Sequence, residues 1–171
     1  LELRRLDPLA VDGAGVVLGL ELGTPCPPWA AIGERPWSAT SYRCIAPLRD
    51  ADGVLRSVHA RDVTDAATPK SVSPRGHEVR GLVLACPVAT GMLQGHASSR
   101  ERVRRHGLLI AEGVPDWLTL IAQGHGRDDA PATIGVLSGS WTPAHASRVP
   151  DGATVTIATH RDTTGDGYAR A

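Results

Sequence analysis

Three short apolar runs in the second half of the chain constrain the fold more than any other feature. They occupy residues 108–111 ("LLIA"), 133–138 ("TIGVLS") and 153–159 ("ATVTIAT"). Continuous apolar runs of this length are typical of strands buried on both faces of a parallel sheet. Helix signals separate the runs, so the order is strand, helix, strand, helix, strand. This order predicts an α/β fold in which crossover helices connect parallel strands.

The helix signals lie where such crossovers need them. Pro115 suits the first turn of a helix, apolar side chains at helical spacing follow over residues 117–121, and Gly124 suits its end. The Thr-Pro pair at 142–143 predicts the start of a second, short helix that runs to residue 149.

The preceding part of the chain predicts a smaller unit that is β-rich or mixed α/β. Residues 1–40 are rich in Gly and Pro, which excludes long regular elements there. Two β-rich runs flank residues 49–53 ("RDADG"), which is typical of a β-hairpin, and residues 81–89 ("GLVLACPVA") predict a further strand. We therefore expect an N-terminal domain over 1–100 and the parallel α/β domain over 101–171.

The bulk composition restricts the setting and the partners. The formal net charge of the 171 residues is zero, so any basic surface must be local. The cysteines form no CxxC pair, which argues against a zinc ribbon and fits a reducing cytoplasm. No apolar run reaches membrane-spanning length, so we expect a cytoplasmic protein without membrane contact. The most basic stretch, residues 98–107 ("SSRERVRRHG"), predicts a solvated helix face or, as a sharper alternative, a groove for nucleic acid.

Acidic side chains follow two of the predicted strands. Glu112 comes directly after the first, and a group of polar side chains comes after the third: His160, Asp162 and Asp166. Because the carboxyl ends of parallel strands meet at one edge of a sheet, we expect these groups to converge there. Converging carboxylates repel one another unless a cation lies between them, and a hard divalent ion such as Mg²⁺ is the natural occupant. The ordinary alternatives are that Glu112 caps the next helix and that Asp162 belongs to a turn.

The same residues carry a resemblance to the Toprim domain of primases, topoisomerases and related nucleases. The segment "LLIAEGVPDWLTL" resembles the Toprim strand that ends in Glu-Gly, with Glu112, Gly113 and Asp116 in place. The segment "IATHRDTTGDGYA" resembles the strand that ends in Asp-x-Asp before a glycine, with Asp162 and Gly165 in place. The resemblance implies that Glu112 and Asp162 are catalytic metal ligands for Mg²⁺ or Mn²⁺. It also implies that Gly113 and Gly165 approach phosphates, and that Asp116 supports this binding indirectly.

One departure from the Toprim pattern concerns the metal. His160 stands where the pattern has the first acid of Asp-x-Asp. Imidazole is a softer ligand than carboxylate and favours Mn²⁺, Zn²⁺ or Fe²⁺ over Mg²⁺, and the site loses one negative charge. His160 and Asp166 are therefore candidate further metal ligands, and a degenerate site stays open. A complete Toprim fold would continue with a helix and a strand after Tyr168, so we expect a domain truncated at its C-terminus.

The upstream segment resembles the one that precedes Toprim in bacterial, phage and plasmid replicative primases. In "IAPLRDADGVLRSVHARDVTDAATPKSVSPRG" a hairpin ends in Arg61, and the pair Pro69–Lys70 follows. Lys70 is the only lysine in the chain, whereas arginine is the cation everywhere else. The resemblance implies that Arg61 and Lys70 serve catalysis by binding the phosphates of template and nucleotide.

Together these resemblances imply a primase-type nucleotidyltransferase core that synthesises primers on single-stranded DNA by a divalent-metal mechanism. The expected partners are a single-stranded DNA template, nucleoside triphosphates, and a replicative helicase or further domains of a longer protein. Two alternatives stay open. One is a Toprim nuclease with the same metal site, and the other is a catalytically degenerate nucleic-acid-binding module of a replication or mobile-element protein.

Overall fold

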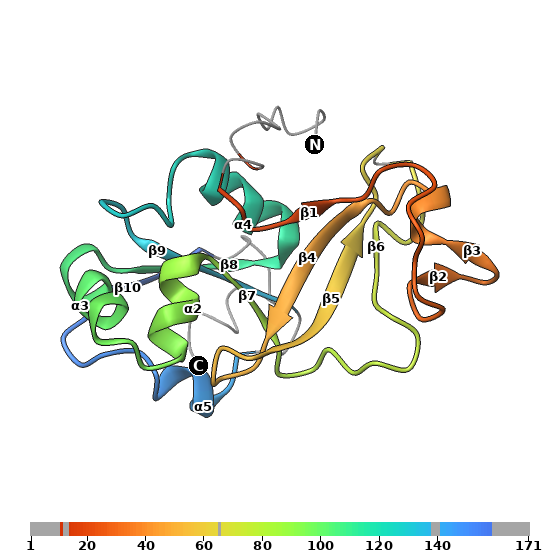
Figure 1. Cartoon of the computed structure of the whole chain (residues 1–171). Coiled ribbons are helices and arrows are strands. Elements are labelled where there is room, and N and C mark those ends of the chain that lie inside the picture. Colours follow the sequence, from red (N-terminus) through yellow and green to blue (C-terminus); the bar gives the residue numbers. More distant parts are fainter. Residues whose placement is uncertain (1–10, 12–13, 65, 138–140, 159–171) are drawn as a thin grey trace.

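The computed structural model describes residues 11, 14–64, 66–137 and 141–158. Within them, an eight-stranded sheet has the order β10-β8-β9-β7-β4-β5-β6, and β1 pairs with β4 (Figure 1). Its strands are β1 Leu18–Gly19, β4 Cys44–Arg49, β5 Leu55–Arg61, β6 Ser71–Val72, β7 Val83–Ala85, β8 Leu108–Glu112, β9 Ala132–Val136 and β10 Val155–Ala158. The helices are α2 Pro87–Leu93, α3 Ala97–His106, α4 Gly113–Ala122 and α5 Pro143–Ala146. A small second sheet consists of β2 Ala31–Ile32 and β3 Arg35–Pro36, and the 3-10 turn Trp37–Ala39 follows it.

The three predicted parallel strands form as expected. Strand β8 lies in the middle and pairs in parallel with β10 on one side and with β9 on the other. Helix α4 joins β8 to β9, and the segment with α5 returns past β8 to β10. Right-handed crossovers in opposite directions place these two connections on opposite faces of the sheet (Figure 1). The prediction of an α/β fold with parallel strands is therefore confirmed.

The predicted β-hairpin also forms, from β4 and β5. The carboxylate of Asp50 accepts hydrogen bonds from the backbone N–H groups of Asp52 and Val54. Gly53 adopts a φ of +71°, in the left-handed region that favours glycine. The pairings of β1, β4, β5, β6 and β7 with one another are antiparallel, so the first part of the chain is β-rich as expected.

Two predicted elements are shorter than expected. Strand β7 ends early because Pro87 starts α2, and the Cys86 sulfur caps that helix by accepting a hydrogen bond from the backbone N–H of Ala89. Helix α5 ends at Ala146, before the expected residue 149. The backbone there tightens into turns with three-residue spacing before Pro150, which disfavours helical conformation in the preceding residue.

Helix α4 packs closely on β9 because Gly135 has no side chain. A Cβ atom on Gly135 would lie 2.8 Å from Leu84 Cδ1 and 2.9 Å from Trp117 Cβ. Trp117 and Leu118 of α4 are fully buried in the main core. Every residue of β9 is buried, whereas β10 is exposed along its length because it ends the described sheet. The apolar runs therefore predict burial correctly for the central strand β9 but not for the outermost strand β10.

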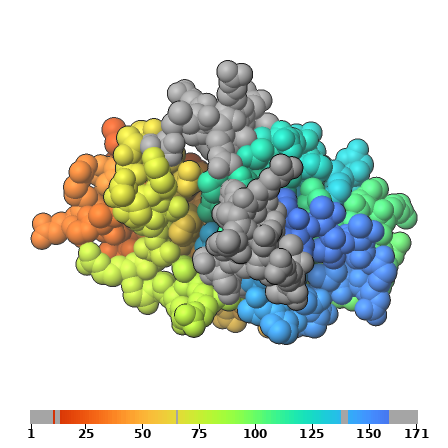
Figure 2. All heavy atoms as spheres, turned by 180° about the vertical axis from the view of Figure 1, so that it is seen from behind, coloured from red at the N-terminus to blue at the C-terminus, as the bar shows by residue number. Residues whose placement is uncertain are grey.

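One sheet extends through both expected domains. Strand β7 pairs with β4 on one side and with β9 on the other. A smaller apolar cluster around Trp37, Tyr42 and Ile45 lies apart from the main core. Figure 2 shows the early segments of the chain gathered at one end of the molecule and the later ones at the other. The division near residue 100 stays a prediction. In the part of the chain that the structure describes, every helix is too short or too polar to cross a bilayer.

Candidate functional site

Glu112 is the last residue of β8 and lies at the carboxyl edge of the parallel strands. Side chains alternate along a strand, so Glu112 shares a face with Ile110 and with Ile157, which pairs with Ile110. The next residue, Gly113, has a φ of +80°, which other residues disfavour. This glycine turns the chain sharply into α4 and leaves the carboxylate at the edge of the sheet. Asp116 lies in the first turn of α4, where the helix dipole favours negative charge.

A cavity of about 500 Å³ opens beside Glu112. The described residues of its wall come from strand ends and from the segment that enters α5, namely Ile110, Ala111, Glu112, Val136, Trp141, Thr142, Pro143, Ala146, Ile157 and Ala158. The Oε2 atom of Glu112 is buried, and no hydrogen-bond partner for it is found among the described residues. A buried carboxylate oxygen without a partner is costly, and a bound cation or donor would satisfy it.

The other predicted metal ligands, His160, Asp162 and Asp166, lie outside the described residues, as does Gly165. Their roles stay predictions. Within the described ranges there is no group of three or more His, Cys, Asp or Glu side chains that could hold a metal ion. Glu112 offers a hard oxygen ligand of the kind that Mg²⁺ and Mn²⁺ accept. The strand that leads toward the other three, β10, lies directly beside β8. Glu112 is thus one suitable ligand, and the metal site itself stays a prediction.

The backbones of Arg61 and Lys70 lie close together at the two ends of a loop that is organised around Asp62. Arg61 ends β5 and pairs with the first residue of β6, which directly follows Lys70. The backbone N–H of Asp62 donates to the carbonyl of Lys70 at 3.0 Å. The Asp62 carboxylate accepts hydrogen bonds from the backbone N–H groups of Thr64 and Ala67 and from the Thr64 hydroxyl. Burial acts to raise the pKa of Asp62, but these hydrogen bonds outweigh it and hold the pKa well below its usual range.

Strand pairing places this basic pair and Glu112 at different ends of the sheet. Glu112 pairs with a residue of β9, which pairs with a residue of β7, which in turn pairs with Arg49 at the end of β4. Arg61 lies level with Cys44 at the beginning of β4. A template strand or a nucleoside triphosphate would have to span this separation to contact both. The shared role of Arg61, Lys70 and Glu112 stays a prediction.

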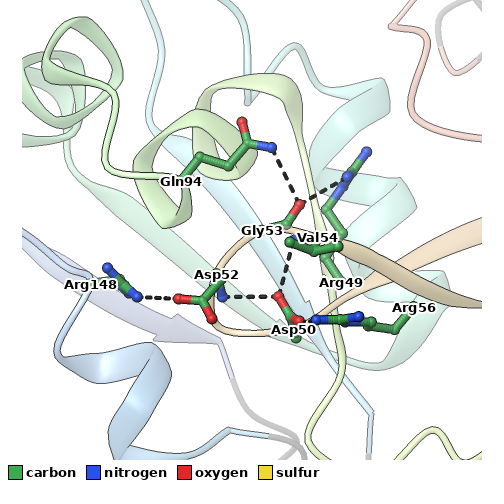
Figure 3. Close-up of polar contacts among 8 residues, drawn as sticks. All are labelled: Arg49, Asp50, Asp52, Gly53, Val54, Arg56, Gln94 and Arg148. Atoms are coloured by element: carbon green, nitrogen blue, oxygen red, sulfur yellow. Dashed lines mark hydrogen bonds and ion pairs between the residues drawn. The ribbon is translucent and has the colours of Figure 1, made fainter.

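The sequence does not reveal a set of polar contacts that fastens the β4–β5 turn to two other elements (Figure 3). Asp52 forms an ion pair with Arg148, which follows α5 and lies 96 residues away. The carbonyl of Gly53 accepts a hydrogen bond from Arg49 at 3.0 Å and one from Gln94 at 3.5 Å. A Cβ atom on Gly53 would lie 2.7 Å from Gln94 Cγ, so the turn packs closely on the end of α2. The "RDADG" motif predicts the turn, but no local pattern indicates its distant partners.

The basic stretch forms helix α3, and several of its arginines bind groups of this chain. Arg100 donates to a backbone carbonyl just after α5 at 2.9 Å. Arg102 forms an ion pair with Asp128, and Arg104 forms one with Glu101 at 3.3 Å. These contacts are typical of an ordinary solvated charged face and favour that interpretation over a groove for nucleic acid.

Comparison with known proteins identifies the fold. No family model matches the chain, and no curated protein matches its sequence. A solved DnaG catalytic core is similar to it with a TM-score of 0.61 and 18% identity, covering 100% of this chain and 57% of that one. The fold is similar to that of a DnaG primase catalytic core.

Two further primase structures share this DnaG-type fold. A DnaG primase catalytic domain bound to single-stranded DNA matches with a TM-score of 0.50 and 19% identity, covering 98% of this chain and 47% of that one. The zinc-binding and RNA polymerase domains of the Aquifex aeolicus primase match with a TM-score of 0.50 and 17% identity, covering 92% and 34%. The chain thus spans 34–57% of the length of these structures. The predicted resemblance to Toprim-containing primase cores is confirmed at the level of the DnaG-type fold.

Proposed function

We propose that this chain is a primase-type nucleotidyltransferase core that synthesises primers on single-stranded DNA. The observation that supports it most is Glu112, whose Oε2 atom is buried without a hydrogen-bond partner among the described residues at the strand edge of a DnaG-type fold. The binding of single-stranded DNA by one of the matched primase domains supports the choice of template. Nucleoside triphosphates are then the second substrate, and a helicase or further domains of a longer protein are the proposed partners.

Glu112 and Asp162 are the proposed metal ligands, with His160 and Asp166 beside them. A bound Mg²⁺ or Mn²⁺ supplies charge stabilisation for the transferred phosphate and the departing pyrophosphate. Glu112 contributes by being already desolvated at the cavity, so its carboxylate needs little rearrangement to accept a cation. Gly113 contributes by turning the chain away, which keeps the backbone clear of the carboxylate.

Arg61 and Lys70 are the proposed phosphate-binding cations. The hydrogen bonds of the Asp62 loop hold the backbones of the two residues close together before any substrate binds. Preorganised cations bind phosphates with a smaller loss of conformational entropy than mobile ones. Charge-assisted hydrogen bonds from both side chains would then hold the template or the nucleotide.

Primer synthesis on a single-stranded template tests the proposal. We expect short products from nucleoside triphosphates, with more product in Mn²⁺ than in Mg²⁺ because the imidazole of His160 favours the softer ion. Glu112→Gln keeps the size of the side chain and should abolish the product. The matched control is Glu101→Gln on the exposed face of α3, which should leave synthesis unchanged.

Three results would contradict the proposal. The first is a folded chain that makes no product with either metal. The second is nicking of plasmid DNA without nucleotides, which would support the Toprim nuclease. The third is binding of single-stranded DNA without any binding of divalent metal, which would support the degenerate module.

A further inference from the structure

A tryptophan held by a buried histidine forms part of the cavity wall beside Glu112. The rings of Trp141 and His145 stack, with centroids 5.6 Å apart and an interplanar angle of 25°. His145 is 1% exposed, and its Nδ1 atom shares a hydrogen bond with the Thr142 hydroxyl at 2.8 Å. Burial lowers the pKa of His145, although the charge of Asp50 acts in the opposite direction. The imidazole is therefore a neutral, fixed support for the indole ring at neutral pH.

Apart from Glu112 and Thr142, the rest of the described cavity wall is apolar. Ile110, Val136 and Ile157 contribute aliphatic side chains from the three parallel strands, and Pro143 contributes its ring from α5. Among the described lining residues, the one ionisable side chain is that of Glu112. Such a wall does not suit a triphosphate, which needs cations and N–H donors. It suits a flat group with apolar faces, and a volume of about 500 Å³ falls within the range of small-molecule sites.

We propose that Trp141 is the stacking platform for the base of a nucleoside triphosphate. This inference rests on the proposed function, because it seats the substrate of that reaction. A neutral support on one side of the indole leaves the ring little freedom, so stacking costs little conformational entropy. Every nucleobase has a π face, so the platform accepts all four bases. Trp141 is a binding residue and takes no part in the chemistry.

Calorimetry on the full chain in Mn²⁺ tests the platform, with ATP and inorganic tripolyphosphate as paired ligands. Trp141→Ala should raise the Kd for ATP roughly 5- to 140-fold, the range expected for loss of one stacked base. The Kd for tripolyphosphate should not change, because that ligand has no base. Trp141→Tyr keeps an aromatic face and should restore most of the ATP affinity. The control is Trp29→Ala, at a tryptophan that is 38% exposed and packs against Trp37 and His77 instead.

Several outcomes overturn the inference. One is an unchanged ATP affinity in Trp141→Ala. Another is an equal loss of affinity for both ligands, which would report damage to the fold. A third is a wild-type chain that does not bind ATP. The inference and the proposed function fail separately: if Trp141→Ala loses ATP selectively but the wild-type chain makes no primer, the platform stands and primer synthesis is refuted.

Discussion

Replacing Asp62 by alanine should destabilise the loop between Arg61 and Lys70 by an amount that the structure allows us to work out. The carboxylate accepts hydrogen bonds from the backbone N–H groups of Thr64 at 3.0 Å and Ala67 at 2.8 Å, and from the Thr64 hydroxyl at 2.8 Å. Each buried donor left without a partner costs about 1–3 kcal/mol. Thr64 is exposed and can bond to water, which leaves the half-buried N–H of Ala67. We therefore expect Asp62→Ala to lower the free energy of unfolding by about 1–3 kcal/mol.

Chemical denaturation at several pH values measures this effect, with Asp62→Asn as the matched variant. The folded state holds the pKa of Asp62 well below its usual range, so the unfolded state takes up the proton first as pH falls. The stabilisation is therefore complete above about pH 4 and declines below it, and the gap between wild type and Asp62→Asn should narrow in acid. The reasoning would be refuted if Asp62→Ala lost less than about 0.5 kcal/mol of stability. It would also be refuted if the difference in free energy of unfolding between wild type and Asp62→Asn did not change with pH.

Three further perturbations test separate parts of the structure. Gly135→Ala should lower the free energy of unfolding by about 1–3 kcal/mol, since the new Cβ would clash with Leu84 and Trp117; an unchanged melting temperature would contradict this packing. His160→Asp should strengthen Mg²⁺ binding in calorimetry if the strand edge is a metal site, and indifference would remove that assignment. A double-mutant cycle on Asp52 and Arg148 should give a coupling of about 0–1 kcal/mol, as for other exposed ion pairs, and a larger value would show that the turn contacts act cooperatively.

The parallel strands and the turn after Glu112 were predictable because their signals are local. A continuous apolar run reports burial for a strand with neighbours on both sides, such as β9, which is buried throughout, whereas the run in β10 at the outer edge of the described sheet is exposed. A glycine directly after Glu112 predicts a local backbone conformation with positive φ, and Gly113 has a φ of +80°. Pattern and structure agree wherever one residue and its near neighbours determine the outcome.

The remaining features depend on distant parts of the chain and could not be predicted. The strand over 81–89 was expected, but its position between β4 and β9 depends on pairing that has no local signature. The partner of Asp52 lies 96 residues away. Trp141 could be recognised as an aromatic residue, whereas its stacking on His145 beside Glu112 follows from the return of the chain past β8. Of the acids predicted at the strand edge, Glu112 falls within the described residues.

The contacts of the β4–β5 turn restrict how this architecture can vary. Tips of β-hairpins usually accept insertions, because nothing but solvent surrounds them. Here Gly53 lies against the end of α2 and Asp52 reaches the segment after α5. An added residue would break both contacts at once, and the segment after α5, which is next to the cavity beside Glu112, would lose its support. Length changes in proteins of this architecture should therefore be rare at this tip, and a chain with a longer tip would need another way to hold α2 and the segment after α5 in place.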